Sequence, residues 1–383
     1  MKDEIKIGFI PLTDSAPLVI AKEEGFFDQF DLDVTLVKEV SWSNIRDKLI
    51  FGEFDAAHML APMLISSSLG LGSVKKPLVT AYAFGLNGNA ISVSNEIFAE
   101  LSSIEKDIVL KPELSASTLK KVIESRKQLG KGMLRFAVVF PYSMHNYLLR
   151  HWFSTSGIEV GEDVEVLVVP PSSVVQALDE GMIDGYCVGE PWNTHAVKKQ
   201  VGVTVITGYE IWNNAPEKVL GVRAAWAQEN VSTHKRLIKA LYLASRWIDD
   251  ADNYPKLVKY LSQEKYVGAP VDSIQNAYKG EVCNPLQGTC RKIPNFSLPY
   301  KYQANFPWQS HAKWIVEQMQ KLGQLSTDFD SAEVAKSVYW TDFYRDVISS
   351  LGVSLPLVNE KQEGLHNDVW FMDDIELGSD AML

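Results

Sequence analysis

The sequence has little cysteine and histidine, the residues on which disulfide frameworks and most transition-metal sites depend. Three Cys and seven His occur among 383 residues, and they form no HExxH or paired CxxC motif. Cys187 lies in an apolar run and is predicted to be a small buried side chain rather than a nucleophile. Cys283 and Cys290 bracket a segment that could close a small disulfide in an oxidising compartment, but the sequence favours two free thiols. Neither a metal site nor a cofactor is predicted.

Positive charge is also scarce. The 37 Lys and Arg face 48 Asp and Glu, which gives a formal net charge of −11. Direct nucleic-acid binding depends on clustered Lys and Arg, so the composition argues against it. With 46% hydrophobic and 22% charged residues the chain is an ordinary globular one. Its length allows two or three lobes with full cores.

Long hydrophobic runs are missing as well. The longest uncharged stretch, residues 56–74, contains His, Pro, Ser and Gly, so no transmembrane helix is predicted. Residues 1–10 carry charges where a secretory signal needs its apolar core. The sequence therefore predicts a cytoplasmic protein without membrane association. A mature exported protein that carries an added Met would begin in the same way.

Strand-like and helical patterns alternate in the first part of the chain. The strand-like runs are 5–10, 34–40 and 56–60, and the helical patterns begin at 16, 43 and 63. Alternation of this kind is typical of an α/β fold with a largely parallel sheet that is covered on both faces.

The same plan recurs about 129 residues later. Residues 134–140 repeat the opening strand, and the GxxD turn of Gly52–Ala57 is matched by that of Gly181–Tyr186. A GxxD sequence is common turn chemistry, but two matches at nearly one offset favour a repeat. The sequence therefore predicts two pseudo-equivalent α/β lobes with a ligand cleft between them.

The remaining segments complete the predicted domain organisation. Residues 95–131 are predicted to be a polar insertion that crosses between the lobes, with a helix at Leu114–Leu129. Four helices are predicted after residue 208, at 234–249, 254–261, 311–322 and 332–349. The acidic stretch 367–383 is predicted to be a strap or disordered. Lobe 1 with its helical C-terminal extension is assigned to 1–92 and 213–383, and lobe 2 to 93–212.

Six segments together resemble the nitrate-binding family of substrate-binding proteins, which serves nitrate, nitrite and bicarbonate ABC transporters. They are GFIPLTDSAPLVIAKEEGFF (8–27), SWSNIRD (41–47), DAAHMLAPM (55–63), NGNAISVS (87–94), VGEPWN (188–193) and NFPWQSHAKW (305–314). The resemblance covers nearly the whole chain. It implies an α/β, two-lobe periplasmic-binding-protein-like (type II) fold with a hinged cleft and a helical C-terminal return.

The resemblance also implies an anion site. Carried over position by position, the family's anion contacts fall on Trp42, Asn89, His145, Gly189 and Lys218. Nitrate is planar with one delocalised negative charge, so a Lys cation, ring or amide N–H groups and a backbone N–H suit its separate oxygens.

Each of these side chains also has an ordinary structural explanation. Trp42 can be a core aromatic, Asn89 a turn residue, His145 a helix-start residue bonded to nearby backbone, and Lys218 a solvated surface charge. Transporter-type relatives carry Gln where Asn89 stands, so the choice between nitrate and nitrite stays open. Bicarbonate-type relatives have an acidic residue at the position of Lys218, so Lys218 favours a monovalent anion without a metal.

Three functions are weighed on this basis. The chain resembles the cytoplasmic nitrate/nitrite sensors of bacterial assimilation operons, which implies an RNA-binding antiterminator of the ANTAR type as partner, released when the ligand binds. The alternative is a periplasmic nitrate/nitrite-binding protein of an ABC transporter whose signal sequence is missing. A pyrimidine synthase of thiamine biosynthesis has a similar fold but uses a cluster of cysteines, which this chain lacks, so an enzyme is not predicted.

Overall fold

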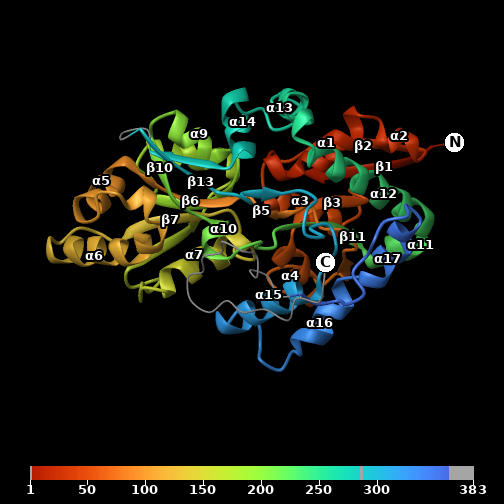
Figure 1. Ribbon diagram of the computed structural model, residues 1–383. Coiled ribbons are helices and arrows are strands. Elements are labelled where there is room, and N and C mark those ends of the chain that lie inside the picture. The colour runs from red at the N-terminus through yellow and green to blue at the C-terminus, as the bar shows by residue number, and fades with distance from the viewer. Residues whose placement is uncertain (1, 285–287, 362–383) are drawn as a thin grey trace.

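The computed structural model describes residues 2–284 and 288–361. Two lobes lie side by side, each built on a five-stranded sheet flanked by helices (Figure 1). The predicted α/β, two-lobe fold is therefore confirmed.

The first sheet has the strand order β2-β1-β3-β11-β4. Its strands are β1 (Asp3–Phe9), β2 (Leu32–Lys38), β3 (Ala56–Leu60), β4 (Leu78–Val79) and β11 (Lys218–Arg223). β1 runs parallel to β2 and β3, whereas β11 runs antiparallel to β3 and β4. The helices of this part of the chain are α1 (Ala16–Glu23), α2 (Phe26–Gln29), α3 (Trp42–Ile50), α4 (Ala61–Leu69), α11 (Ala224–Glu229) and α12 (Val231–Ile248), with the short 3-10 helix η1 (Thr13–Ser15) before α1.

The second sheet has the order β10-β6-β9-β7-β8. Its strands are β6 (Asn89–Ser94), β7 (Leu134–Val138), β8 (Val164–Val168), β9 (Gly185–Gly189) and β10 (Gly202–Thr207). The helices are α5 (Asn95–Ile104), α6 (Ser115–Gln128), α7 (Met144–Ser154), α8 (Val174–Asp179), α9 (Trp192–Lys198) and α10 (Gly208–Ile211), with the 3-10 helices η2 (Ile108–Leu110), η3 (Pro112–Leu114) and η4 (Pro171–Ser173).

The internal repeat extends to the register of the two sheets. Gly8 of β1 pairs with Ala57 of β3, and Ala137 of β7 pairs with Tyr186 of β9, which is the same pair shifted by 129 residues. The Asp of each GxxD turn accepts a hydrogen bond from an equivalent backbone amide in the two lobes. The Oδ2 atom of Asp55 accepts from the amide of Lys6, as that of Asp184 does from the amide of Arg135.

Two segments connect the lobes and are bonded to each other. The short strand β5 (Leu86–Asn87) leads into β6, and the return segment leads from α10 to β11. The amide of Asn87 donates to the carbonyl of Ala215, and the amide of Ala215 donates to Oδ1 of Asn87. The predicted lobe boundary at 92/93 falls within β6, a strand that pairs wholly within the second sheet.

The segment 95–131 does not cross between the lobes, so that prediction was wrong. Its two helices pack within lobe 2: α5 contacts β6 and β10, and α6 lies against α5. Ser115 at the start of α6 accepts a hydrogen bond from the indole of Trp152 on α7. The polar composition reflects the exposed faces of these helices, while Leu119, Val122 and Ile123 are buried.

The chain after α12 returns mainly over lobe 1. It contains η5 (Ala251–Asn253), α13 (Tyr254–Leu261), α14 (Val271–Lys279), β12 (Glu281–Asn284), β13 (Thr289–Lys292), β14 (Ser297–Leu298), α15 (Gln309–Lys321), α16 (Ser331–Val338) and α17 (Thr341–Ser349). α13 contacts α1, α15 contacts α4 and α17 contacts α12, whereas α14 reaches α9 of lobe 2. The helix predicted at 332–349 is two helices, because the carbonyl of Val338 accepts from the amide of Thr80 and the amide of Trp340 donates to the carbonyl of Thr80. Residues 367–383 lie outside the described residues.

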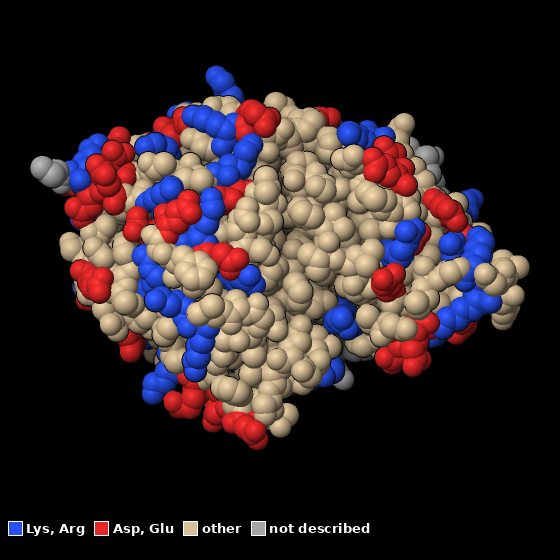
Figure 2. Space-filling view, turned by 180° about the vertical axis from the view of Figure 1, so that it is seen from behind, with Lys and Arg blue, Asp and Glu red and all other residues tan. Residues whose placement is uncertain are grey.

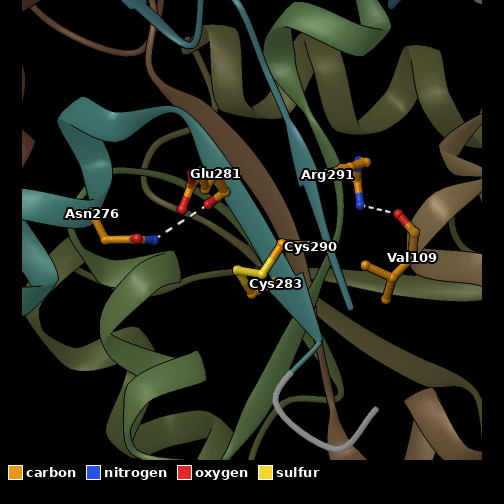
Figure 3. The surroundings of a disulfide bond; sticks show 6 residues. All are labelled: Val109, Asn276, Glu281, Cys283, Cys290 and Arg291. Atoms are coloured by element: carbon orange, nitrogen blue, oxygen red, sulfur yellow. Dashed lines mark hydrogen bonds between the residues drawn. A yellow bond between two sulfur atoms is a disulfide. The ribbon is translucent and has the colours of Figure 1, made fainter. Parts of the chain in front are cut away.

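A disulfide joins Cys283 to Cys290, so the prediction of two free thiols was wrong. The two cysteines lie directly opposite each other in the antiparallel hairpin of β12 and β13 (Figure 3), and this hairpin was not predicted from the sequence. Arg291 anchors the hairpin to lobe 2 by donating to both carboxylate oxygens of Glu210 and to the carbonyl of Val109. The hairpin therefore links the C-terminal return to the second lobe.

The surface carries charge of both signs. On the face shown in Figure 2, Lys and Arg side chains alternate with Asp and Glu, and a broad uncharged band separates the charged regions. Within the described residues, no helix has the length and apolar character needed to cross a membrane.

Candidate functional site

The predicted site residues lie at the ends of strands and helices of both lobes. Trp42 is the first residue of α3, and Ser41 caps this helix by accepting from the amide of Asn44. His145 lies in the first turn of α7, which Ser143 caps in the same way. Lys218 begins β11 on the lobe 1 side. Local capping and strand chemistry thus fix the backbone positions from which these side chains reach the cleft.

Asn89 and Gly189 bring two strands of lobe 2 to the same point. Asn89 begins β6, Gly189 ends β9, and the two residues pair across the ladder. A Cβ atom built on Gly189 would lie 3.4 Å from Oδ1 of Asn89 and 3.5 Å from Nζ of Lys218. Glycine at this position therefore leaves space open directly in front of the lysine.

Lys218 lies at the centre of the site. Its Nζ atom lies 5.9 Å from the ring centroid of Trp42, within cation–π range. The same atom lies 2.7 Å from Oδ2 of Asp14 and 2.8 Å from Oε1 of Glu217. Burial opposes the charge on Lys218, but Asp14 and then Glu217 raise the pKa of the amine above its ordinary value, so it is protonated.

Several hydrogen-bonding groups of the site have no partner among the described residues. They include the indole Nε1 of Trp42, both ring nitrogens of His145 and Oδ1 of Asn89. Burial, and then the charge of Lys218, lower the pKa of His145 well below its ordinary value, so the ring is neutral and has one N–H to donate. Buried polar atoms without a partner are costly, and their gathering at one point is typical of a ligand site.

The structure thus brings all five predicted residues together. Trp42, Asn89, His145 and Lys218 are each at most 1% exposed. This burial removes the alternative of a solvated surface charge for Lys218.

Three further residues of the site were missed by the sequence analysis. Asp14 and Glu217 hold Lys218, and Nε2 of His58 lies 3.1 Å from Oδ1 of Asp14. Burial opposes ionisation of Asp14, but Lys218 and then His58 lower its pKa below the usual range, so this carboxyl is ionised. Asp14 and His58 occur in segments already noted for their resemblance, and Glu217 directly precedes Lys218. The signal that could have found them was the need to balance a buried lysine.

The site is closed to solvent on several sides. The cavity beside Lys218 has a volume of about 20 Å³, little more than one water needs, and its lining includes Tyr278 from α14 and Leu298 from β14. The amide and the hydroxyl of Thr13 in lobe 1 both donate to the carbonyl of Glu190 in lobe 2. A ligand can therefore reach Lys218 only if the lobes or the covering segments move apart.

A metal centre or a reactive thiol would be a further source of chemistry. Within residues 2–284 and 288–361, no group of three or more His, Cys, Asp or Glu side chains is arranged to hold a metal ion. Cys187 is buried, and burial raises the pKa of its thiol, as expected for a core side chain and not for a nucleophile.

Fold and site together define a periplasmic-binding-protein-like protein with a buried polar site between two lobes. The crystal structure of the periplasmic nitrate-binding protein NrtA from Synechocystis superposes with a TM-score of 0.87 at 28% sequence identity, over 94% of this chain and 93% of that one. The model of the NMT1-like family matches residues 1–262. The chain belongs to this family, in its branch of ABC-type substrate-binding proteins homologous to NrtA.

Two curated relatives support the same assignment. The nitrate/nitrite binding protein NrtA of Synechococcus elongatus is 33% identical over 359 residues, which cover 91% of this chain and 78% of the relative. The nitrate import ATP-binding protein NrtC of Synechocystis is 36% identical over 355 residues, which cover 92% of this chain and 51% of the relative. The chain thus spans about half the length of NrtC. One of these relatives is named for nitrate import and the other for binding nitrate and nitrite.

Proposed function

We propose that the protein binds nitrate or nitrite between its lobes through Trp42, Asn89, His145, Gly189 and Lys218. The observation that carries the proposal is the convergence of these residues on a sealed point with a buried lysine and unpaired ring N–H groups. Nitrate offers three oxygens and nitrite two to such donors, and the lysine balances the single negative charge of either anion. The names of the homologous NrtA proteins support the same ligand.

Calorimetry with nitrate, nitrite, bicarbonate and sulfate tests the ligand. At about 100 times the dissociation constant, the true ligand should stabilise the fold by about 2.7 kcal/mol, which also raises the melting temperature. Binding of bicarbonate or sulfate in preference to nitrate and nitrite would contradict the proposal.

A pair of tryptophan variants tests the site. Trp42→Phe keeps the aromatic ring but removes the indole N–H, so nitrate affinity should fall by about tenfold, the worth of one hydrogen bond to a charged group. Trp212→Phe is the matched control, because Trp212 is also buried with an unpaired indole but packs against Trp314. Lys218→Ala is a less clean variant, since it leaves Asp14 and Glu217 without their cation. Equal affinities of the two phenylalanine variants would place the ligand elsewhere.

Of the two nitrate-binding roles weighed from the sequence, the transport role has more support. NrtC is named as a nitrate import protein, and NrtA is named as a nitrate/nitrite binding protein. The bond between Cys283 and Cys290 is also of the kind that persists in oxidising compartments. We therefore propose a substrate-binding component of an ABC-type importer that acts outside the cytoplasm. Release of the protein by osmotic shock in its native host is the expected result, and retention with cytoplasmic markers would contradict it.

The cytoplasmic sensor role stays a prediction from the sequence. It requires a complex with an RNA-binding antiterminator that dissociates when nitrate or nitrite is added. Co-purification from the native host without and with nitrate tests it. Absence of such a partner in both preparations would contradict the sensor role, and the transport role would then be the one that remains.

A further inference from the structure

Glu217 is a buried carboxyl that contacts three of the residues proposed to bind the anion. Its Oε1 atom lies 2.8 Å from Nζ of Lys218 and 3.9 Å from Nε2 of His145. Its Oε2 atom accepts a hydrogen bond from Nδ2 of Asn89. The Glu217 carboxyl group thus contacts the same donor groups that a bound anion would need.

The charges around Lys218 do not favour an added anion. Asp14 is a second carboxylate on the same lysine and is held ionised. If Glu217 is also ionised, one cation faces two anions, and an entering nitrate adds a further negative charge to a site closed to water. Burying an uncompensated charge is costly.

The other titratable groups around the site supply no positive charge at neutral pH. Burial lowers the pKa of His145 on α7 and of His58 on β3, so both rings are neutral. The Cys187 thiol on β9 is near enough to Glu217 for its charge to act on it, and the Tyr278 hydroxyl on α14 donates to the carbonyl of Thr13, beside Asp14. Burial raises the pKa of both groups, so both are neutral. Lys218 is already charged. The groups that could still gain a proton are therefore Glu217 and the two histidines.

Glu217 is the best placed of these. Burial raises the pKa of its carboxyl above the ordinary value in spite of the neighbouring lysine. A protonated carboxyl releases Lys218 from one of its two anions and gains an O–H that can donate to an anion oxygen. Protonating either histidine instead would place a cation beside Lys218, which lowers the pKa of both rings.

We propose that Glu217 takes up a proton from solvent when the anion binds, so that the site receives an anion and a proton together. The proposal rests on the proposed nitrate or nitrite site and adds how that site balances its charge. It also gives a reason for preferring monovalent anions, because a divalent anion such as sulfate would need a second proton for which the site has no equally suited acceptor.

The proposal predicts how affinity depends on pH. Nitrate itself does not titrate near neutral pH, so any change comes from the protein. Glu217 should have a higher pKa in the complex than in the free protein. As the pH rises from the lower of these two values to the higher, the dissociation constant for nitrate should rise by up to tenfold for each pH unit. Below both values and above both values it should not change.

Calorimetry of nitrate binding in buffers of different ionisation enthalpy, from pH 6 to pH 9, counts the protons taken up. The wild type should take up as much as one proton per nitrate, and Glu217→Gln should take up none and bind with an affinity independent of pH. The comparison variant is Glu190→Gln. Glu190 is another buried acid, with a pKa raised by burial to about 7, but its side chain bonds to the amide of Thr194 and lines a neighbouring cavity. This variant should keep the proton uptake.

An infrared difference spectrum of the wild type with and without nitrate provides a second measurement that needs no stable variant. A new band of a protonated carboxyl should appear on binding. Binding without proton uptake, or uptake that survives in Glu217→Gln, would overturn the proposal while leaving the anion site intact. Enhancement of binding by a divalent cation at fixed pH would overturn it too, because a metal would then balance the charge. If neither nitrate nor nitrite binds at any pH, the proposed function itself fails.

Discussion

At the scale of single residues, the site combines a fully buried lysine with side chains that lack partners. Lys218 needs Asp14 and Glu217 to be stable in the interior, because an isolated buried ammonium would lose its proton. Among the described residues, none bonds to the ring nitrogens of Trp42 and His145, so packing holds these two side chains in place. Asp14 and Glu217 therefore balance the charge of Lys218, while the ring nitrogens of Trp42 and His145 have no partner among the described residues and can bond to a ligand.

Gly189→Ala tests the open space in front of Lys218. The new methyl group would lie at ordinary contact distance from Asn89 and Lys218, so the fold should keep its stability while nitrate affinity falls by about tenfold or more. Gly185→Ala at the other end of β9 is the control. Its Cβ would lie 2.5 Å from the Phe136 ring, so it should cost about 1–3 kcal/mol of stability without a direct effect on binding. Thermal melts and calorimetry measure both, and the reverse pattern would show that Gly189 does not face the ligand.

His234 gives a pH prediction away from the site. It stacks on Phe343, and burial lowers the pKa of its ring to about 3. Because the unfolded state binds the proton near pH 6.5 and the folded state does not, this group makes the fold less stable as the pH falls below 6.5. The loss should reach about 2 kcal/mol at pH 5. Urea denaturation of the wild type and of His234→Gln at pH 8 and pH 5 should show a smaller loss for the variant, and equal losses would contradict the assignment.

The sequence could identify the five site residues only through their resemblance to a known family. From composition alone, a structural role was as good an explanation for Trp42 and His145 as a ligand-binding role. The structure shows that both side chains are buried and that both lie at the cleft. Asp14 and Glu217 were missed because ion pairs between residues far apart in the sequence leave no local pattern. Glu217 and Lys218 are neighbours, but only the fold turns both toward the same point.

At the scale of elements, the repeat of 129 residues predicted more than the presence of two lobes. The same offset relates the paired residues of β1 and β3 to those of β7 and β9. The same GxxD turn precedes β3 and β9, and a turn of fixed geometry sets the register of the strand that follows it. The helices α5 and α6 and the hairpin of β12 and β13 belong to no repeat. Their packing depends on long-range contacts that no local periodicity records.

The hairpin disulfide can be tested by counting thiols. Denatured protein without reductant should show one reactive thiol, that of Cys187, whereas three would mean that Cys283 and Cys290 are free. Replacing both by Ser should lower the free energy of unfolding by about 2–3 kcal/mol, as expected for a short closed loop. Reductant should lower the melting temperature of the wild type but not that of the double variant, and an equal response of both would contradict the bond.

At the scale of the whole molecule, the two lobes meet in a closed arrangement. The site is sealed, and the amide of Thr13 bonds across the cleft to Glu190. The whole chain has a net charge of −11, but its acidic side chains are not gathered in one region on the face shown in Figure 2. Six acidic residues and no basic one fall in 362–383, outside the described residues. Charge on that face alone therefore does not single out a surface for a basic protein partner.

Hydrogen exchange measures this closure directly. If nitrate holds the lobes together, the amide of Thr13 should exchange more slowly when nitrate is added. The amide of Asp55 is the internal control, because it bonds to Lys6 within lobe 1 and should not change. Equal slowing of both amides would indicate general stabilisation, and no change at Thr13 would show that binding does not depend on the lobes closing.

The most direct test of the central claim is a crystal structure of the protein grown with nitrate. The account predicts a planar anion between the lobes, within hydrogen-bond distance of the indole nitrogen of Trp42 and a ring nitrogen of His145, and beside the amine of Lys218. An anion bound elsewhere, or a cleft in which Lys218 keeps both carboxylates and no anion enters at saturating nitrate, would contradict it.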